Sequence, residues 1–268
     1  MTVNEIRHYF LERSPWVKDR NLTWDNVICG DGNREANRIL VTWQSTLAAV
    51  RKAVDGGFDT LITHEPTYWG YSDVQERQLY FKEQPDKYVV SQEKLDLLEK
   101  LTVLRLHDTW DRFPEYGIPY TWGRFLGFGQ PDIVGGDGYL LCYNVPENSA
   151  ENWARALAAK TAALGEPLVQ FVGNPDKAVR RIGIGTGCAG RPNDYMKLGC
   201  DMGVSCDDGT GYWSELACAI DLGFPVVRVN HRTSEEPGMK SLTEYLCREL
   251  KLDAEYFCEG CMYKLVGK

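Results

Sequence analysis

Short apolar runs alternate along the chain with segments whose apolar residues recur at helical spacing, which predicts strands and helices in alternation. Predicted strands cover residues 26–29, 38–43, 60–63, 102–106 and 139–143, with others near Val169, Ile182, Val204, Val227, Tyr256 and Tyr263. Predicted helices cover residues 3–13, 46–54, 93–101 and 150–164, with others near Tyr195, Leu216 and Leu242. Residues 68–91 and 112–138 lack a clear period and are predicted to be irregular. The pattern predicts an α/β fold of mixed sheets flanked by helices.

The composition narrows the classes of function. A formal net charge of -8 argues against a broad basic surface for nucleic acid. No apolar run is long enough to span a bilayer, and residues 1–14 lack the apolar core of a signal peptide. Nine cysteines, an odd number spread through the chain, fit reduced thiols better than a disulfide framework. We therefore expect a cytoplasmic protein that binds neither nucleic acid nor membranes.

Three of the four histidines share one context: each follows an apolar run and has an acidic residue nearby. His64 is followed directly by Glu65. His107 is followed by Asp111, and His231 by Glu235, each four positions later, whereas His8 has no such context and is interpreted as structural. Imidazole and carboxylate groups are the ligands of catalytic divalent metals, so these strand ends are predicted to converge on one metal centre.

The alternative for any single histidine is a hydrogen-bonded residue of the core or surface. That alternative would have to hold for all three motifs, which favours the metal hypothesis. Asp111 and Glu235 are then the candidates to bridge two ions, and a pair of ions activates a water molecule for hydrolysis.

Two segments of the chain resemble each other. Residues 57–65 and 199–207 both have the form Gly-x-Asp, a four-residue spacer, a polar tip and an acid, and a strand and a His-x-x-x-acid motif follow each. Chance remains an alternative for so short a match. If the match is a repeat, the protein consists of two related α/β lobes, and the metal site lies in the cleft between them.

Two further motifs have more than one interpretation. Gly185 to Gly190 satisfies G-x-G-x-x-G, but its late position and Pro192 favour a tight turn that lines a ligand pocket over a dinucleotide fingerprint. Cys258 and Cys261 form a single C-x-x-C, and without a second pair we interpret them as ordinary thiols rather than as a zinc site.

Aromatic and basic residues near these motifs also have two interpretations. Trp69, Trp110 and Trp213 are either core residues or a platform on which a flat heterocycle stacks. Arg112 and Arg232 either contact a substrate phosphate or pair with nearby acids.

In its motifs the chain resembles the NGG-interacting-factor-three-like family, the dinuclear-metal-centre hexameric proteins often called type 2 GTP cyclohydrolase I homologues. The family's Thr-His-His-Pro, His-Thr-x-x-Asp, Gly-x-Pro-Asp-Lys, Thr-Gly-Glu and Gly-His-x-x-x-Glu motifs are similar, in that order, to residues 63–66, 107–111, 173–177, 205–207 and 230–235. Two departures stand out: Glu65 replaces the family's second histidine, and Asp108 replaces its threonine.

The resemblance implies one family domain over residues 1–268, made of two lobes (about 1–125 with 180–268) and a middle segment (about 126–180). It also implies a toroidal homohexamer with one or two divalent ions per subunit. Carboxylate in place of imidazole at Glu65 shifts metal preference from zinc toward manganese, iron or magnesium, and makes Glu65 a candidate general base.

The hypothesis that follows is a divalent-metal-dependent hydrolase, cyclohydrolase- or phosphohydrolase-like, acting on a small nucleotide-like substrate with metal-activated water. Its metal ligands are predicted to be His64, Glu65, His107, Asp111, His231 and Glu235, with Glu65 also the catalytic candidate. No organic cofactor is predicted. A non-enzymatic metal-binding or scaffold protein is the competing hypothesis, and metal-free nucleotide binding at the Gly185 loop is a third.

Overall fold

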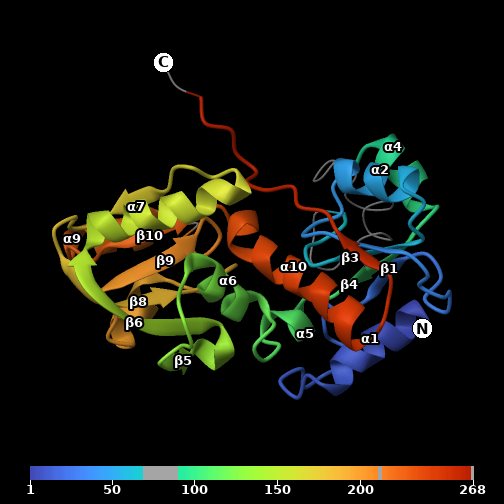
Figure 1. Cartoon of the computed structure of the whole chain (residues 1–268), viewed down its shortest axis with the longest axis horizontal. Coiled ribbons are helices and arrows are strands. Elements are labelled where there is room, and N and C mark those ends of the chain that lie inside the picture. Colours follow the sequence, from blue (N-terminus) through green and yellow to red (C-terminus); the bar gives the residue numbers. More distant parts are fainter. Residues whose placement is uncertain (69–89, 211–212, 267–268) are drawn as a thin grey trace. The chain divides into compact units, whose positions relative to one another are not determined.

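The computed structural model describes residues 1–68, 90–210 and 213–266, which form two compact units (Figure 1). The first unit comprises residues 1–116 and 239–258, and the second comprises residues 117–238 and 259–268. The division falls inside helix α10 (His231–Glu249), which begins in the second unit and ends in the first. Among the described residues, no helix is both long and apolar enough to cross a membrane.

The sheet of the first unit has the strand order β1–β4–β3–β2–β11. All neighbouring strands are parallel except β1, which runs antiparallel to β4 at one edge. Its strands are β1 (Val27–Cys29), β2 (Ile39–Val41), β3 (Thr60–Thr63), β4 (Thr102–Arg105) and β11 (Ala254–Tyr256). Because β2, β3 and β4 are buried along their whole length, their sequences are apolar runs rather than alternating ones.

Helices of the first unit begin where the sequence supplies caps. Thr2 and Glu5 form a capping box at the start of α1 (Val3–Glu12), and the hydroxyl of Thr46 accepts the Ala49 amide of α2 (Leu47–Asp55). The hydroxyl of Ser91 caps α4 (Gln92–Leu98) in the same way, and α5 (Asp108–Asp111) follows β4. Side chains of α2 and α4 pack with those of β2, β3 and β4 in one apolar cluster. A second cluster is aromatic, comprising Phe10, Trp110, Phe113 and Tyr245.

The sheet of the second unit has the strand order β5–β6–β8–β9–β10–β7. β8, β9 and β10 are parallel, and antiparallel strands border them on both sides. Its strands are β5 (Ile133–Gly135), β6 (Leu140–Ser149), β7 (Gln170–Val172), β8 (Ala178–Ile184), β9 (Met202–Cys206) and β10 (Val226–Val229). Residues 126–180, expected as a middle segment, thus contain β5, β6 and β7 of this sheet.

Helices cover both faces of this sheet. The helices are α6 (Ile118–Leu126), α7 (Ala150–Thr161), α8 (Pro192–Lys197) and α9 (Trp213–Asp221), with short 3₁₀ turns at Gly136–Gly138 and Ala162–Leu164. Successive residues of β6 point to opposite faces: Leu141 joins the cluster under α6 and α7, whereas Leu140 and Cys142 join the one under α8 and α9. The second unit is therefore a three-layer α/β structure.

The structure corrects two predictions of local structure. Residues 112–138, predicted to be irregular, contain α6 and β5. No strand forms at Tyr263. His231 follows strand β10, as predicted, and also begins helix α10. The irregular segment predicted at 68–91 lies mostly outside the described residues.

The predicted repeat extends over five elements in each unit. Among the described elements, the order β2–α2–β3–α4–β4 of the first unit matches β8–α8–β9–α9–β10 of the second, and each strand set is parallel. An antiparallel edge strand from earlier in the chain, β1 or β7, borders the last strand in each case. The glycines that precede the middle strands have almost the same left-handed backbone, with φ of 70° at Gly57 and 71° at Gly199. The two units therefore share one local architecture.

Candidate metal centre

Two neighbouring parallel strands position the histidines of the first unit. β3 ends at Thr63 and β4 at Arg105, and these two residues are paired across the ladder. His64 and His107 follow at the same edge of the sheet, as carboxyl ends of parallel strands do. Their rings stack with centroids 4.5 Å apart and an interplanar angle of 10°. The structure therefore brings together two of the three histidines that were predicted to converge.

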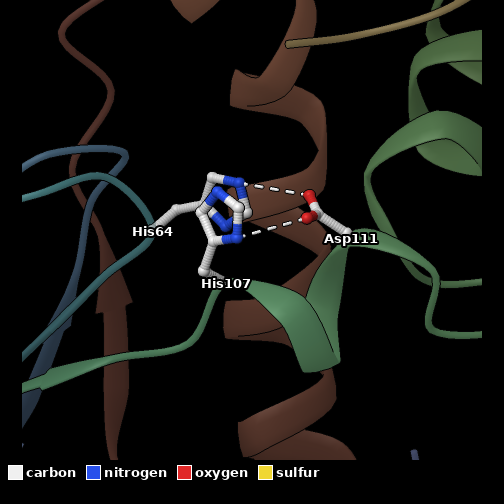
Figure 2. Close-up of side chains that lie close together, drawn as sticks. All are labelled: His64, His107 and Asp111. Carbon is white, nitrogen blue, oxygen red and sulfur yellow. Dashed lines mark ion pairs between the residues drawn. The ribbon is translucent and has the colours of Figure 1, made fainter. Parts of the chain in front are cut away.

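Helix α5 adds a carboxylate to the pair. Asp111 lies four residues after His107 and directs its two oxygens to the two rings (Figure 2). Its Oδ1 is 3.3 Å from Nε2 of His64, and its Oδ2 is 3.3 Å from Nδ1 of His107. One ligand atom from each of the three side chains lies within 4.8 Å of the other two, which is close enough for one ion to contact all three.

The tautomer of His64 favours a cation at this position. Nδ1 of His64 lies 3.0 Å from the carbonyl oxygen of Leu106, and only a protonated nitrogen donates to a carbonyl. In the neutral ring, Nε2 then directs its lone pair toward an oxygen of Asp111. Two electron pairs that face each other need a proton or a metal ion between them. A backbone carbonyl that fixes the second nitrogen is also the usual outer partner of a metal-binding histidine.

Negative charge exceeds positive charge around His107. Its Nδ1 lies 3.0 Å from Oδ1 of Asp108, and its Nε2 lies 3.9 Å from Oε1 of the buried Glu65. Burial lowers the pKa of His107, but the Asp111 carboxylate and its neighbours outweigh burial and raise it. Asp108 responds in the opposite direction: burial raises the pKa of this carboxyl, but its hydrogen bonds with His107, the Trp24 amide and Thr23 and the charge of His107 together outweigh burial and lower the pKa. Carboxylates gathered in a desolvated site require a compensating cation.

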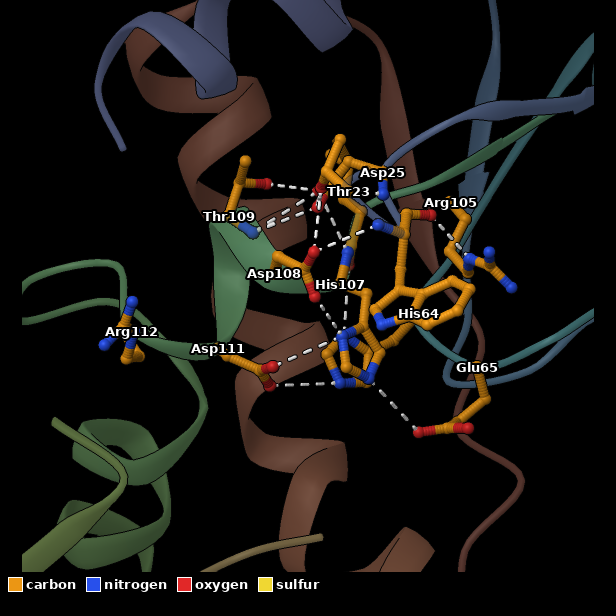
Figure 3. A network of polar contacts seen from close by, with 12 residues as sticks. Thr23, Asp25, His64, Glu65, Arg105, His107, Asp108, Thr109, Asp111 and Arg112 are labelled. Atoms are coloured by element: carbon orange, nitrogen blue, oxygen red, sulfur yellow. Dashed lines mark hydrogen bonds and ion pairs between the residues drawn. The ribbon is translucent and has the colours of Figure 1, made fainter. Parts of the chain in front are cut away.

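Asp25 is a fully buried carboxylate that fixes the backbone around His107 (Figure 3). Its Oδ1 accepts the His107 amide at 3.0 Å, and its Oδ2 accepts the Thr109 amide at 3.2 Å, so it satisfies amides at the start of α5. The hydroxyls of Thr23 and Thr109 donate to the same carboxylate. Burial raises the pKa of Asp25. Asp25 and Thr23 were not predicted as site residues.

The second unit places His231 and Glu235 one helical turn apart at the start of α10. Nε2 of His231 is 3.1 Å from Oε1 of Glu235. A β-carbon at Gly187 would lie 3.4 Å from each of these two atoms, so the Gly185–Gly190 loop borders the pair. This geometry fits the predicted tight turn and not a dinucleotide fingerprint, because only the short helix α8 follows the loop.

Asp207 supports His231 as Asp25 supports His107. Its Oδ1 accepts the His231 amide at 2.7 Å, and its Oδ2 accepts the side-chain amide of Asn230 at 2.9 Å. The hydroxyl of Tyr263 donates to Oδ2 at 3.0 Å. The polar tip that follows β9 therefore supplies a supporting residue, whereas the tip that follows β3 supplies His64 and Glu65 themselves.

The donor set of the first unit fits a divalent transition metal. Imidazole nitrogens and carboxylate oxygens suit zinc, iron and manganese. The separation of 3.3 Å between donor atoms matches the edge of a tetrahedron with metal–ligand bonds of roughly 2.0–2.1 Å. The structure thus gathers His64, Glu65, His107 and Asp111 in one unit and pairs His231 with Glu235 in the other.

The remaining candidate residues have other surroundings. Trp110 is completely buried and stacks on Phe113, so it is a core residue and not a platform for a ligand. Trp213 is 69% exposed, and Trp69 lies outside the described residues. Arg112 donates to the carbonyl of Trp16 at 3.4 Å. Cys258 and Cys261 are both in the thiol form.

Comparison with known proteins finds a family model that matches the chain. The family model described as Duf34/NIF3 (NGG1p interacting factor 3) matches residues 1–259. No curated protein matches the chain significantly.

Solved structures share the fold at low sequence identity. Staphylococcus aureus protein SA1388 has 17% identity and a TM-score of 0.76, with 99% of each chain covered. Protein ybgI, described as of unknown function, has 18% identity and a TM-score of 0.73, over 96% of this chain and 98% of that one. Reduced HcgD from Methanocaldococcus jannaschii has 20% identity and a TM-score of 0.69, over 96% and 97%.

Proposed function

The chain belongs to the Duf34/NIF3 family, and from this premise we propose that it is a divalent-metal-dependent hydrolase of a small, nucleotide-like substrate. The observation that carries the proposal is the approach of His64 and His107 to the two oxygens of Asp111, each at 3.3 Å. A divalent ion held there would supply Lewis acidity and generate hydroxide from water near neutral pH. Cyclohydrolase and phosphohydrolase reactions both use this chemistry.

Each residue of the first unit has a distinct part in the proposal. His64 and His107 bind the ion through nitrogen, and Asp111 binds it through oxygen. Glu65 is 6% exposed, and its Oε1 lies 3.9 Å from Nε2 of His107. This position suits a general base that takes a proton from the attacking water, and it equally suits a fourth ligand. Asp25 and Asp108 orient His107.

The proposal extends to the second unit and to the whole molecule. His231 and Glu235 are further metal ligands, so one or two ions bind per subunit. Manganese, iron, magnesium and zinc are the candidate ions, because the donor set combines imidazole nitrogens with carboxylate oxygens. We further propose a cytoplasmic homohexamer that takes a small-molecule substrate.

A metal-binding protein without enzymatic activity is the second candidate. The observation that favours it is the number of carboxylates around His107: Glu65, Asp108 and Asp111 all lie within 4 Å of its ring nitrogens. If these carboxylates filled the coordination sphere, no position would remain for water, and a closed site is structural rather than catalytic.

Glu65→Gln separates the two candidates, because it keeps the shape of the side chain and removes its basicity. The metal-reconstituted protein is assayed on nucleoside phosphates and cyclic nucleotides beside Glu65→Gln and the control Glu12→Gln, an exposed position. The hydrolase proposal predicts turnover by the native protein and the control, and a loss of about 100-fold or more in Glu65→Gln. The variant retains its metal if Glu65 is the base and loses it if Glu65 is the fourth ligand. Metal binding without turnover of any substrate supports the binding protein instead.

A further inference from the structure

Two buried cysteines of the second unit lie side by side. Sγ of Cys200 is 3.4 Å from Sγ of Cys142 and donates a hydrogen bond to it. Cys142 is fully buried and Cys200 is 7% exposed, and both belong to the apolar cluster under α8 and α9. The two residues are 58 positions apart in the chain, so the fold brings them together.

Glycines make the contact possible. Cys142 of β6 is paired with Gly183 of β8, which is paired in turn with Gly203 of β9, so the three residues form a row on one face of the sheet. A β-carbon at Gly183 would overlap Cδ1 of Tyr195 and lie 3.0 Å from Sγ of Cys200, so the ring and the thiol share the space that the missing side chain leaves. The left-handed backbone of Gly199, with φ of 71°, turns the chain so that Cys200 enters this space.

We propose that Cys142 and Cys200 are a reversible disulfide site, oxidised by a small peroxide. One sulfur attacks a peroxide oxygen, becomes a sulfenic acid and releases the other oxygen as water. The second sulfur then displaces the sulfenic hydroxyl, which leaves as a second water when it takes the remaining thiol proton. Two electrons pass from the sulfur pair to the peroxide, and the S–S bond replaces two S–H bonds.

Distance and access both support the pair as the reacting unit. Closure requires the sulfurs to approach from 3.4 Å to about 2.05 Å, a displacement smaller than a side-chain rotation produces. Because Cys142 is fully buried and Cys200 is only 7% exposed, the pair suits a small oxidant such as a peroxide rather than a protein oxidant. The hydrogen bond from Cys200 also lowers the pKa of Cys142, and Arg181 acts in the same direction, so the pair holds a thiolate more readily than an isolated buried thiol.

The disulfide would tie two parts of the second unit together. Tyr195 belongs to the same cluster as the thiols, and its hydroxyl donates to the carbonyl of Val204 at 2.6 Å. A β-carbon at Gly190 would overlap this hydroxyl, so Tyr195 also packs against the loop that borders His231 and Glu235. A bond between β6 and the turn before β9 would therefore hold Tyr195 and this loop more rigidly.

The test treats the full-length protein with hydrogen peroxide, blocks the remaining thiols with N-ethylmaleimide, and identifies the linked peptides by mass spectrometry before and after reduction. The expected result is a peptide pair joined through Cys142 and Cys200, with the mass of two hydrogens lost, that dithiothreitol separates. The Tm of the oxidised native protein is expected to rise by about 5–10 °C, and Cys200→Ser is expected to show no rise.

Cys206→Ser is the matched control, because Cys206 is equally buried and donates to the carbonyl of Gly187 instead of to a thiol. This variant is expected to form the same linked pair. The proposal is overturned if Cys142 and Cys200 are both alkylated after unfolding at peroxide concentrations that have already oxidised the exposed Cys247. Oxidation of either residue to a sulfinic acid without cross-linking would overturn it as well.

Discussion

The two units share one local architecture but place different side chains at the tip of its middle strand. In both, a helix, a left-handed glycine and an aspartate lead into the middle strand. Two residues after the next strand ends, a histidine stands at the start of a helix, with a carboxylate four residues later. The tip of the middle strand differs. In the first unit it presents His64 and Glu65 beside His107, whereas in the second it presents Cys206 and Asp207, and Asp207 accepts the His231 amide.

The feature that the two units share is an aspartate that supports the histidine. In each unit an aspartate carboxylate accepts the amide of the histidine that starts the helix: Asp25 for His107 and Asp207 for His231. The first carboxylate comes from the segment before β1, and the second from the tip after β9. Because the second tip has this supporting role, it adds no imidazole, and the first unit holds the denser set of metal donors.

The largest expected effect is the loss of metal from the first unit in Asp111→Asn. The carboxamide keeps the size of the side chain but removes the charge that faces both imidazoles. We expect metal affinity to fall by about 100-fold or more, since changes to outer partners alone cost 10–100-fold. Glu235→Gln is expected to lower the metal content less, and the exposed Asp55→Asn not at all. Metal titration of the three variants checks this order; a greater loss in Glu235→Gln would reverse the comparison.

The supporting carboxylates are expected to have the next largest effect. Asp25→Asn weakens the bonds to the His107 and Thr109 amides, so we expect metal affinity in the first unit to fall by about 10-fold. The free energy of unfolding is expected to fall by about 1–3 kcal/mol, because buried amides lose a charged acceptor. Asp207→Asn is the matched variant in the second unit. Metal titration measures the affinity, and urea unfolding measures the free energy of unfolding. Native values of both in Asp25→Asn would show that Asp25 does not support His107.

The repeated glycines provide a test in which the two units should agree. Gly57→Ala and Gly199→Ala each place a side chain on a left-handed backbone, which costs about 1–2 kcal/mol. The added carbon would meet only the Arg38 guanidinium at 3.6 Å or that of Arg181 at 3.4 Å, so steric overlap adds little. Equal destabilisation in urea unfolding supports the repeat. A difference of more than about 1 kcal/mol between the two variants would argue that the units are not equivalent here.

The smallest effect concerns the pH dependence of stability in the second unit. Both oxygens of Glu166 accept the Asn230 amide, and burial raises the pKa of Glu166 above its ordinary value of 4.5. Its carboxyl therefore holds a proton more tightly in the folded chain than in the unfolded one. Its contribution to stability is complete below pH 4.5 and is lost as the pH rises through the raised folded pKa. We expect the free energy of unfolding to decline less steeply with rising pH in Glu166→Gln than in the native protein or in the control Glu99→Gln. Urea unfolding at several pH values above 4.5 measures this decline.

Local sequence signals are sufficient to predict the repeated strands and helices but not helix α6. The apolar runs of β2, β3 and β4 and the cap at Thr46 are visible without any tertiary information. Helix α6 was missed because its glycines and proline were interpreted as marks of a loop. Pro119 lies in the first turn, where no amide is needed, and Gly127 is the left-handed residue that ends the helix, with φ of 96°.

The candidate site also contains both residues that the sequence predicts and a residue that it does not predict. His64, Glu65, His107 and Asp111 were predicted, together with His231 and Glu235, because each histidine follows an apolar run and has an acidic residue nearby. The first four lie together because β3 and β4 are neighbouring parallel strands whose ends meet at one edge of the sheet. Asp25 lies 82 positions before His107, in a segment whose only local feature is that it precedes a short strand. Its role depends on burial and on the pairing of β1 with β4, which sequence spacing does not reveal.

The most direct test of the account is the metal content of three purified proteins after reconstitution with manganese, iron or zinc: the native chain, His107→Ala and His8→Ala. His8 is exposed and serves as the histidine control. We predict that the native protein and His8→Ala bind equal amounts of metal, and that His107→Ala loses the ion of the first unit. Native metal content in His107→Ala, or no metal in the native protein with any of the three ions, would contradict the central claim.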